Sequence, residues 1–138
     1  MKKIVITGGL GYIGTQLCKL YTPDTLNNEI IVTDSRFLPE RVKNLKEWGF
    51  KYVQCDLLNE DVLEKVLKDS DIVYHLGGIT DVAYVKSEMN DEQDRLIEKV
   101  GVHGSRNIIK YTSEKTKIIF PSTHVVFEGF EETAFDIT

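Results

Sequence analysis

Glycines spaced for a phosphate-binding turn stand near the start of the sequence. The octapeptide TGGLGYIG, residues 7–14, contains Gly9-x-Gly11-x-x-Gly14 and, in a second register, Gly8-x-x-Gly11-x-x-Gly14. Glycine lets the backbone turn tightly and approach a pyrophosphate closely, and the first amides of a following helix bind the phosphates without a basic side chain. The octapeptide therefore predicts a dinucleotide site. A glycine-rich turn without a ligand is the alternative.

The same glycines also have the spacing of a P-loop, Gly9-x-x-x-x-Gly14. A P-loop needs a lysine and then a serine or threonine directly after its last glycine, because these side chains bind the phosphates and Mg²⁺. This chain has Thr15 and Gln16 at those positions. The P-loop interpretation is therefore excluded.

An acidic residue follows at the distance that a dinucleotide site requires. Asp34 stands 20 residues after Gly14, at the end of the second apolar stretch, where a carboxylate binds the ribose hydroxyls of the adenosine. It would repel the additional phosphate of NADP by about 4 kcal/mol before screening, for charges about 4 Å apart at an effective dielectric constant of about 20. We therefore expect NAD rather than NADP. Arg36 offsets part of this repulsion, unless it is a solvated loop arginine.

Residues at the ends of two later strands also suit a cofactor. Asp56 closes the third apolar stretch, where its carboxylate either accepts a hydrogen bond from an adenine amino group or only turns the chain toward the next helix. Gly77 and Gly78 follow the fourth stretch. They either let the backbone pass close to a cofactor or form a plain tight turn.

Short β-branched stretches alternate with amphipathic ones along the whole sequence. Strands are expected over residues 2–7, 29–34, 50–56, 71–78 and 116–123, with helices between them, the last from about Glu88 to Tyr111. This pattern predicts an α/β fold, a doubly wound parallel sheet of strand order 3-2-1-4-5 in a three-layer αβα Rossmann arrangement. Pro39 is expected to open the second helix, Gly49 to end it, and Asn59 to cap the third.

Composition limits the class of protein. The 138 residues, 41% of them hydrophobic, suit one domain spanning residues 1–138. A net charge of −5 with scattered lysines gives no basic stripe, so neither nucleic acid nor a membrane is an expected partner. No apolar run approaches the roughly 20 residues that cross a bilayer, and no signal-peptide core follows the first lysines, so we expect a cytoplasmic protein. Cys18 and Cys55 lack metal-ligand spacing, so they are expected to be reduced thiols and no metal site is expected.

Six sequence motifs occur in a fixed order. TGGLGYIG is followed by Asp34 after VT, then by CDLL, HLGG, GSRN and FPSTHVVFEG. In this order they resemble the extended short-chain dehydrogenases, the NAD-dependent epimerase/dehydratase family that includes UDP-glucose 4-epimerase. The resemblance covers almost the whole chain, and it implies that the register beginning at Gly8 is the one in use.

The resemblance implies a bound NAD and assigns residues to its parts. Tyr12 and Ile13 would meet the pyrophosphate, Asp56 and Leu57 the adenine, and Leu76 the other half of the cofactor. The expected cofactor-binding residues are together Gly8, Gly11, Tyr12, Ile13, Gly14, Asp34, Ser35, Arg36, Asp56, Leu57, Leu76, Gly77 and Gly78.

One catalytic position is also implied. Thr123 in FPSTHVVFEG matches the family's catalytic serine or threonine, whose hydroxyl orients the substrate hydroxyl or carbonyl during hydride transfer. A hydroxyl that caps a turn is the alternative. His75 and His124 are interpreted as packing or turn histidines because neither has a spaced partner, and His103 is interpreted as structural.

The family's acid/base pair, Tyr-x-x-x-Lys on a helix beyond the Thr123 position, is missing. The match from Tyr111 to Lys115 is expected by chance and falls at the end of the long helix, away from a ligand crevice, so we interpret it as helix-end packing. Gly101, Phe127 and Glu128 also depart from the family pattern, where Asn, Tyr and Gly usually stand. We therefore expect an incomplete Rossmann domain that lacks the catalytic helix and the substrate domain and is inactive alone.

Two functions remain open from the sequence. The first is the NAD-binding portion of an NAD-dependent nucleotide-sugar epimerase/dehydratase, with the nucleotide sugar bound through the missing C-terminal part. The second is a non-catalytic NAD-binding sensor or subunit module. The fifth strand would form an unpaired edge, and because exposed apolar edges associate, a homodimer is expected.

Overall fold

The computed structural model describes residues 1–78 and 91–122 of the chain. In these residues five strands form one sheet: β1 (Lys3–Thr7), β2 (Glu29–Asp34), β3 (Lys51–Gln54), β4 (Ile72–His75) and β5 (Lys117–Ile119). Their order is β3-β2-β1-β4-β5, and every neighbouring pair is parallel. The predicted doubly wound sheet of order 3-2-1-4-5 is confirmed, and β3 and β5 are the outer strands of those described.

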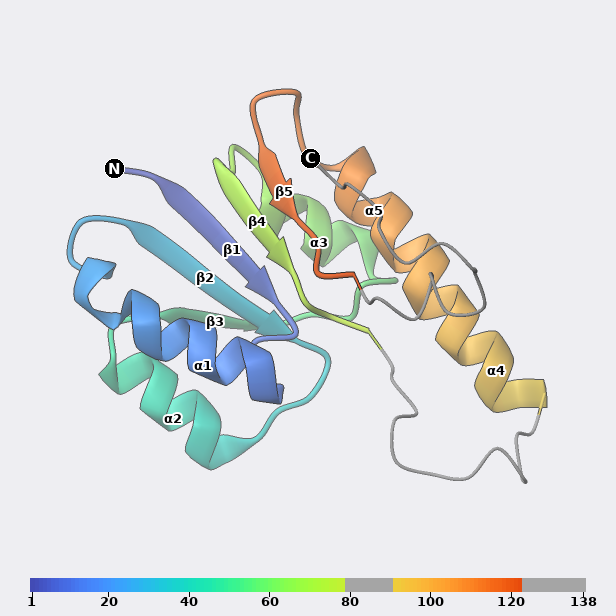
Figure 1. Ribbon diagram of the computed structural model, residues 1–138, viewed down its shortest axis with the longest axis horizontal. Coiled ribbons are helices and arrows are strands. Elements are labelled where there is room, and N and C mark those ends of the chain that lie inside the picture. The colour runs from blue at the N-terminus through green and yellow to red at the C-terminus, as the bar shows by residue number, and fades with distance from the viewer. Residues whose placement is uncertain (79–90, 123–138) are drawn as a thin grey trace, which may run out of the picture.

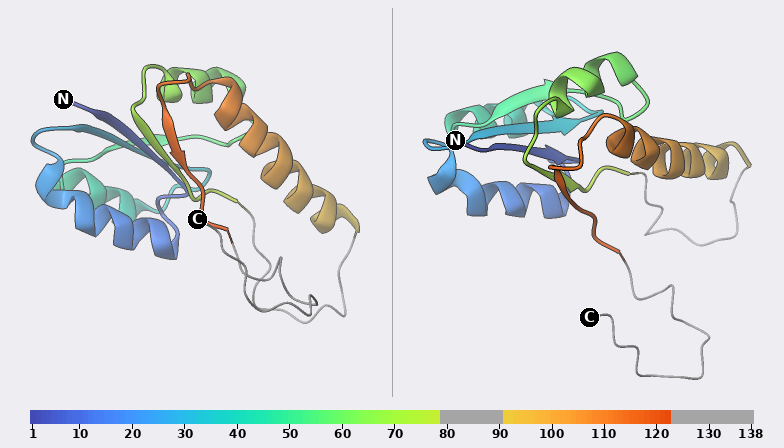
Figure 2. Two further views of the ribbon diagram at one scale, coloured as in Figure 1. Left: turned by 45° about the horizontal axis from the view of Figure 1, so that its top comes forward. Right: turned by 90° about the horizontal axis from the view of Figure 1, so that it is seen from above.

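Helices cover both faces of the sheet. The helical elements are α1 (Tyr12–Tyr21), the short η1 (Thr22–Asp24), α2 (Pro39–Glu47), α3 (Glu60–Leu67), α4 (Asp91–Glu98), η3 (Lys99–His103) and α5 (Gly104–Lys110). Figure 1 shows α1 and α2 side by side, with α3 and α5 beyond the strands. Seen along the sheet, α1 lies on one side of the strands and α3 and α5 on the other (Figure 2). None of the described helices is long and apolar enough to cross a bilayer.

The central strands are buried on both faces, as a parallel sheet between helices requires. Alternate residues of a strand point to opposite faces. Ile4 and Ile6 of β1 belong to the core beneath α1 and α2, which also holds Val42. Val5 belongs to the second core, which includes Leu63 and other residues of α3 and α5. β1 therefore joins the two halves of the hydrophobic core.

The predicted helix boundaries of α2 and α3 are confirmed. Pro39 is the first residue of α2. Gly49, with φ +94°, turns the chain just after that helix ends. The Asn59 side chain accepts a hydrogen bond from the Val62 amide at 3.4 Å and so caps α3.

The long fourth helix differs from its prediction. It is interrupted by η3, one turn of π-helix, between α4 and α5, and its predicted start before residue 91 lies outside the described residues. The Ser105 hydroxyl donates to the Gly101 carbonyl at 2.6 Å, and such a bond to the preceding turn competes with regular helical geometry. Single π turns occur often at functional sites, and this one lies next to the groove described below.

The glycine turn after β1 holds the start of α1 close to the sheet. Gly8 has φ +67°, a left-handed conformation that side chains disfavour. A Cβ atom at Gly14 would lie 2.5 Å from the Gly8 carbonyl oxygen and 2.7 Å from Gly9 Cα. Only glycine fits there, because all of these neighbours are backbone atoms.

Replacement of Gly14 by alanine should therefore destabilise the fold. Gly14→Ala is expected to lower the free energy of unfolding by about 3 kcal/mol, the upper part of the usual range for overpacking, because the clashing backbone cannot move aside. Gly101→Ala is the matched control, since a Cβ there meets nothing within 4 Å. Urea unfolding followed by circular dichroism measures both, and equal stability of the two variants would show that α1 has room to shift.

Candidate functional site

A groove of about 970 Å³ runs along the carboxyl edge of the sheet. Its volume falls at the upper end of the roughly 300–1,000 Å³ typical of small-molecule sites. Turns that follow β1, β2, β3 and β4 form its walls, because the carboxyl ends of parallel strands meet at one edge. All of the predicted cofactor-binding residues line it, namely Gly8, Gly11, Tyr12, Ile13, Gly14, Asp34, Ser35, Arg36, Asp56, Leu57, Leu76, Gly77 and Gly78.

The sequence interpretation missed several residues of the groove wall. Leu96 of α4 and Val100 of η3 line the groove, and their spacing of four residues on a helix was the signal that could have identified them. Cys55 and Pro121 also line it. They carry no pattern that distinguishes them from other strand-end residues.

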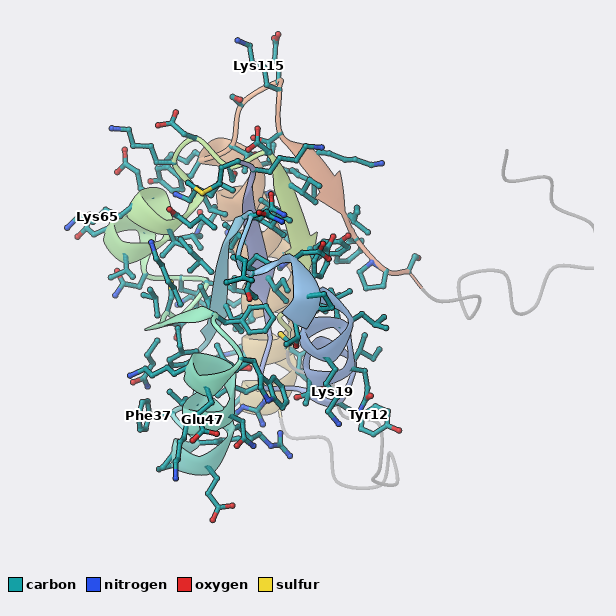
Figure 3. All side chains as sticks on the ribbon, turned by 90° about the vertical axis from the view of Figure 1, so that its left-hand side faces the viewer. Tyr12, Lys19, Phe37, Glu47, Lys65 and Lys115 are labelled. Atoms are coloured by element: carbon teal, nitrogen blue, oxygen red, sulfur yellow. The ribbon has the colours of Figure 1, made fainter. Side chains whose placement is uncertain are left out.

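The N-terminus of α1 opens into the groove without a cap. Gly11 is the N-cap residue and offers no side-chain acceptor, and the first turn contains no acidic residue. The first amides of a helix have no acceptor within it. The Tyr12 side chain is 84% exposed and projects away from the molecule (Figure 3), so it does not cover this end of the helix. The positive end of α1 is therefore free to bind an anion.

Asp34 joins the glycine turn to the end of β2. Its side chain is only 6% exposed. Oδ2 accepts a hydrogen bond from the Leu10 amide at 3.1 Å, while Oδ1 accepts one from the Arg36 amide at 3.1 Å. The sequence predicted this carboxylate as a ribose ligand. The structure shows that it also fixes the turn that would hold the phosphates.

The Arg36 guanidinium contacts the same carboxylate. Its Nε lies 3.1 Å from Asp34 Oδ1 and its second terminal nitrogen 3.4 Å from Oδ2, and this hydrogen bonding raises the pKa of Arg36. Burial and then the charge of Asp34 raise the pKa of Tyr52 to about 12, so its hydroxyl stays protonated and donates to the Arg36 carbonyl. Arg36 is thus a paired arginine, although its side chain is half exposed.

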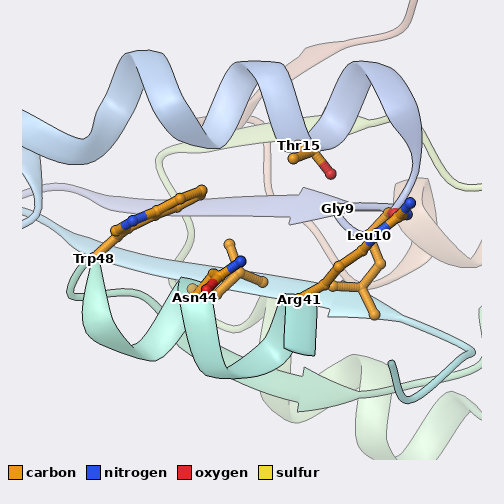
Figure 4. Close-up of a pocket in the computed structure, with 7 residues that line it drawn as sticks. Gly9, Leu10, Thr15, Arg41, Asn44 and Trp48 are labelled. Carbon is orange, nitrogen blue, oxygen red and sulfur yellow. The ribbon is translucent and has the colours of Figure 1, made fainter. Parts of the chain in front are cut away.

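Arg41 holds the glycine turn from the opposite side. Its guanidinium reaches from α2 to the Leu10 carbonyl (Figure 4) and donates a hydrogen bond to it. The cavity between α1 and α2 that Arg41, Trp48 and Thr15 line holds only about 20 Å³. That is room for a single water molecule, so this cavity is not a ligand site. No sequence pattern predicts this role of Arg41, because its hydrogen-bond partner Leu10 lies 31 residues away.

The turns after β1 and β4 touch each other. The Gly77 amide donates to the Thr7 hydroxyl at 3.0 Å, and a Cβ at Gly8 would lie 2.7 Å from the Gly77 nitrogen. Asp56 has the turn role that was one of its two predicted alternatives, since its Oδ1 accepts from the Leu58 amide at 2.9 Å. The residue also lines the groove, and its bond to an adenine amino group stays a prediction.

The remaining candidates divide into residues that the structure describes and residues that it does not. Thr123, His124, Phe127 and Glu128 lie outside the described residues. Tyr111 is packed at the C-terminal end of α5, where its hydroxyl donates to Glu60 at 2.8 Å. It does not line the groove.

The two cysteines are free and buried. Burial raises the pKa of Cys55 to about 11 and that of Cys18 to about 12, so both stay protonated thiols near neutral pH. Within residues 1–78 and 91–122, no group of three or more His, Cys, Asp or Glu residues is arranged to hold a metal ion.

Comparisons with known proteins identify a family and several relatives that this chain resembles. The model of the 3-beta hydroxysteroid dehydrogenase/isomerase family matches residues 5–136. The dTDP-D-glucose 4,6-dehydratase of Dictyostelium discoideum is 36% identical over 88 residues, which are 59% of this chain and 20% of that protein. The 3 beta-hydroxysteroid dehydrogenase/Delta 5-->4-isomerase of Monkeypox virus is 28% identical over 149 aligned positions, covering 100% of this chain and 41% of that protein.

A solved structure shares the fold. It is UDP-glucose-4-epimerase from Stenotrophomonas maltophila with bound NAD and formylated UDP-arabinopyranose. The TM-score is 0.74 at 17% identity, with 96% of this chain and 40% of that chain covered. This chain therefore spans less than half the length of each of these three relatives.

The role of Asp34 in holding the turn predicts a loss of stability without any ligand. Asp34→Ala should lower the free energy of unfolding by about 2 kcal/mol, because the Leu10 amide loses its partner in a buried place. Arg36→Ala should cost less than about 1 kcal/mol, because it removes only a half-exposed ion pair. Urea unfolding of the ligand-free variants measures both, and equal losses would contradict the scaffolding role.

His75 predicts a pH-dependent stability. Its imidazole is 3% exposed, and burial lowers its pKa from the ordinary 6.5. The unfolded chain therefore binds the proton more readily than the folded chain. The stability that the neutral His75 contributes to the fold is complete above pH 6.5 and declines as the pH falls toward the folded-state pKa. We expect the stability difference between the unaltered chain and His75→Asn to shrink between about pH 7.5 and about pH 5 in urea unfolding. A constant difference over this range would contradict a neutral buried His75.

Proposed function

Because this chain belongs to the 3-beta hydroxysteroid dehydrogenase/isomerase family, we propose that it is the NAD-binding Rossmann domain of an enzyme that transfers hydride between NAD and a substrate hydroxyl or carbonyl. This membership confirms the relationship to NAD-dependent epimerases and dehydratases that the motifs predicted. One observation carries the proposal: the uncapped start of α1 and the Asp34 carboxylate line the same groove.

The residues present fit the chemical parts of NAD. The first amides of α1, at Tyr12 and Ile13, would donate to the pyrophosphate, and glycine at Gly8 and Gly11 lets the backbone come close to it. The carboxylate of Asp34 would accept hydrogen bonds from the ribose hydroxyls. Asp56 and Leu57 would border the adenine, and Leu76 with Gly78 the nicotinamide half.

Binding of the ribose requires a local exchange of partners at Asp34. The carboxylate offers about four acceptor positions, and four donors occupy it: two backbone amides and two nitrogens of the Arg36 guanidinium. The guanidinium is half exposed, so we infer that the ribose hydroxyls replace it while the amide bonds persist.

NAD supplies the acceptor for a hydride from the substrate. Proton transfer and substrate orientation fall to side chains, and we propose that the Thr123 hydroxyl orients the reacting hydroxyl or carbonyl, as its motif implies. The groove residues would exclude water from one face of the cofactor, since Leu76, Leu96 and Val100 are apolar.

We propose a nucleotide sugar as the substrate, supported by the similarity to the Dictyostelium dehydratase and by the fold shared with the Stenotrophomonas epimerase. A hydroxysteroid is the second candidate, favoured by the matching family model and by the viral relative. To separate the two candidates, NAD-linked turnover by the full-length protein is measured with dTDP- or UDP-sugars in one assay and with a 3β-hydroxysteroid in the other. A cytoplasmic homodimer, and a non-catalytic module that only binds NAD, remain predictions from the sequence.

Cofactor choice tests the proposed function directly. NADH should bind at least about tenfold more tightly than NADPH, because the Asp34 charge repels the additional phosphate. Titrations followed by Trp48 emission and by cofactor fluorescence give both dissociation constants. Equal affinities for NADH and NADPH would refute the role of Asp34. No binding of either cofactor would refute the whole site.

Variants sharpen this test. Arg36→Ala should widen the preference for NADH, because the cation that offsets the carboxylate and competes with the ribose is gone. Lys19→Ala is the matched control. Lys19 is an exposed cation in the last turn of α1 and should leave the ratio unchanged.

A further inference from the structure

A continuous chain of hydrogen bonds lies directly behind the groove. The Gly77 amide donates to Thr7 Oγ1 at 3.0 Å, and Thr7 Oγ1 lies 2.9 Å from His75 Nδ1. On the other side of the imidazole, His75 Nε2 lies 3.0 Å from Ser105 Oγ, which donates to the Gly101 carbonyl at 2.6 Å. The chain therefore runs from the turn after β4 to the π turn η3.

For a neutral imidazole, the two ends of this chain fix the direction of every bond. The Ser105 hydroxyl uses its single proton on the Gly101 carbonyl, so Ser105 Oγ can only accept from His75 Nε2–H. A neutral imidazole then has no proton on Nδ1, so Nδ1 accepts from the Thr7 hydroxyl. That hydroxyl still accepts from the Gly77 amide. Of the two tautomers of a neutral His75, only the Nε2–H tautomer satisfies all four bonds.

The surroundings leave these groups little freedom to rearrange. Thr7 has no exposed surface and His75 is 3% exposed. The Phe120 ring stacks on the imidazole with centroids 5.5 Å apart. The sequence interpretation made His75 a packing or turn histidine. Its hydrogen-bond partners come from β1 and α5 and, through Thr7, from the turn that lines the groove.

We propose that His75 is a positioning residue for the cofactor. Its Nδ1 orients the Thr7 hydroxyl, the hydroxyl holds the Gly77 amide, and this sets where the backbone of Gly77 and Gly78 lies along the groove. The inference rests on the proposed function, because this backbone segment borders the nicotinamide half of the proposed NAD site. His75 itself does not line the groove.

Two substitutions of His75 separate its two hydrogen bonds. In His75→Asn the side-chain oxygen takes the place of Nδ1 and keeps the acceptor for Thr7, whereas in His75→Gln the amide nitrogen takes the place of Nε2 and keeps only the donor to Ser105. We expect His75→Asn to bind NADH within about threefold of the unaltered chain. His75→Gln should bind at least about tenfold more weakly, the scale of one lost buried hydrogen bond.

A second pair of variants makes the same comparison from the other partner. Thr7→Ser keeps the hydroxyl and should keep the affinity within about threefold, while Thr7→Val keeps the shape and should lose at least about tenfold. Melting curves by circular dichroism accompany each titration. Equal NADH affinity of the Asn and Gln variants, or of the Ser and Val variants, would overturn the positioning role.

Nitrogen-15 NMR of the imidazole in the unaltered, ligand-free chain tests the inference even if a variant fails to fold. We expect a protonated Nε2 and an unprotonated Nδ1 near neutral pH in the unaltered chain. If Thr7→Val folds, we also expect a shift of its Gly77 amide resonance. The opposite tautomer or a charged imidazole would overturn the inference. Absence of NADH binding to the unaltered chain would instead overturn the proposed function, so the two failures are distinguishable.

Discussion

The bond between the Asp34 carboxylate and the Leu10 amide is the constraint on which the groove depends. It ties the turn after β1 to the end of β2, and Arg41 holds the carbonyl of the same residue from α2. Leu10 is thereby fixed through both of its backbone groups, and its side chain is buried. The position of the α1 N-terminus follows from this, because the helix begins two residues later. An anion site made of backbone amides has no side chain that can adjust, so its accuracy depends on how firmly this turn is held.

Strand order decides which turns meet at the groove. In the order β3-β2-β1-β4-β5, the chain continues from β1 to one side and returns with β4 on the other. The turn after β1 therefore faces the turn after β4, and ligands bind at this point in doubly wound sheets. Gly8 allows the two backbones to approach each other closely, because a Cβ atom there would lie 2.7 Å from the Gly77 nitrogen. The Thr7 hydroxyl then links the two turns. Thr7 is the last residue of β1 and leads into Gly8, and its hydroxyl accepts a hydrogen bond from the Gly77 amide in the turn after β4.

Local signals in the sequence predicted the fold and most of the groove. The alternation of strands and helices and the place of Asp34 follow from apolar periodicity and from spacing, which depend on residues near one another in the sequence, and the strand order follows from them by the rules for parallel sheets. Three features could not be predicted in this way. The π turn η3 depends on the Ser105 hydroxyl competing for one carbonyl, the role of Arg41 depends on a partner 31 residues away, and the bonds of His75 join residues 68 and 30 positions apart. The contacts of Arg41 and His75 are tertiary contacts of polar side chains, which no periodic pattern encodes. The Ser105 bond is local, but a helical pattern does not show whether a serine hydroxyl will bond to the preceding turn.

The Asp34 carboxylate can hold the turn and still bind a ribose because its present hydrogen-bond partners differ in how much free energy it costs to displace them. The backbone amides of Leu10 and Arg36 both donate to the Asp34 carboxylate, which is 6% exposed. Breaking the bond to Leu10 in particular leaves a buried polar group without a partner. The guanidinium is half exposed, and an ion pair of that kind contributes about 1 kcal/mol or less, since water solvates the released cation. In the proposed NAD complex, an incoming pair of hydroxyls would therefore displace the guanidinium and leave the amides in place. The turn keeps its geometry while the carboxylate changes partners, which is the property a preformed nucleotide site requires.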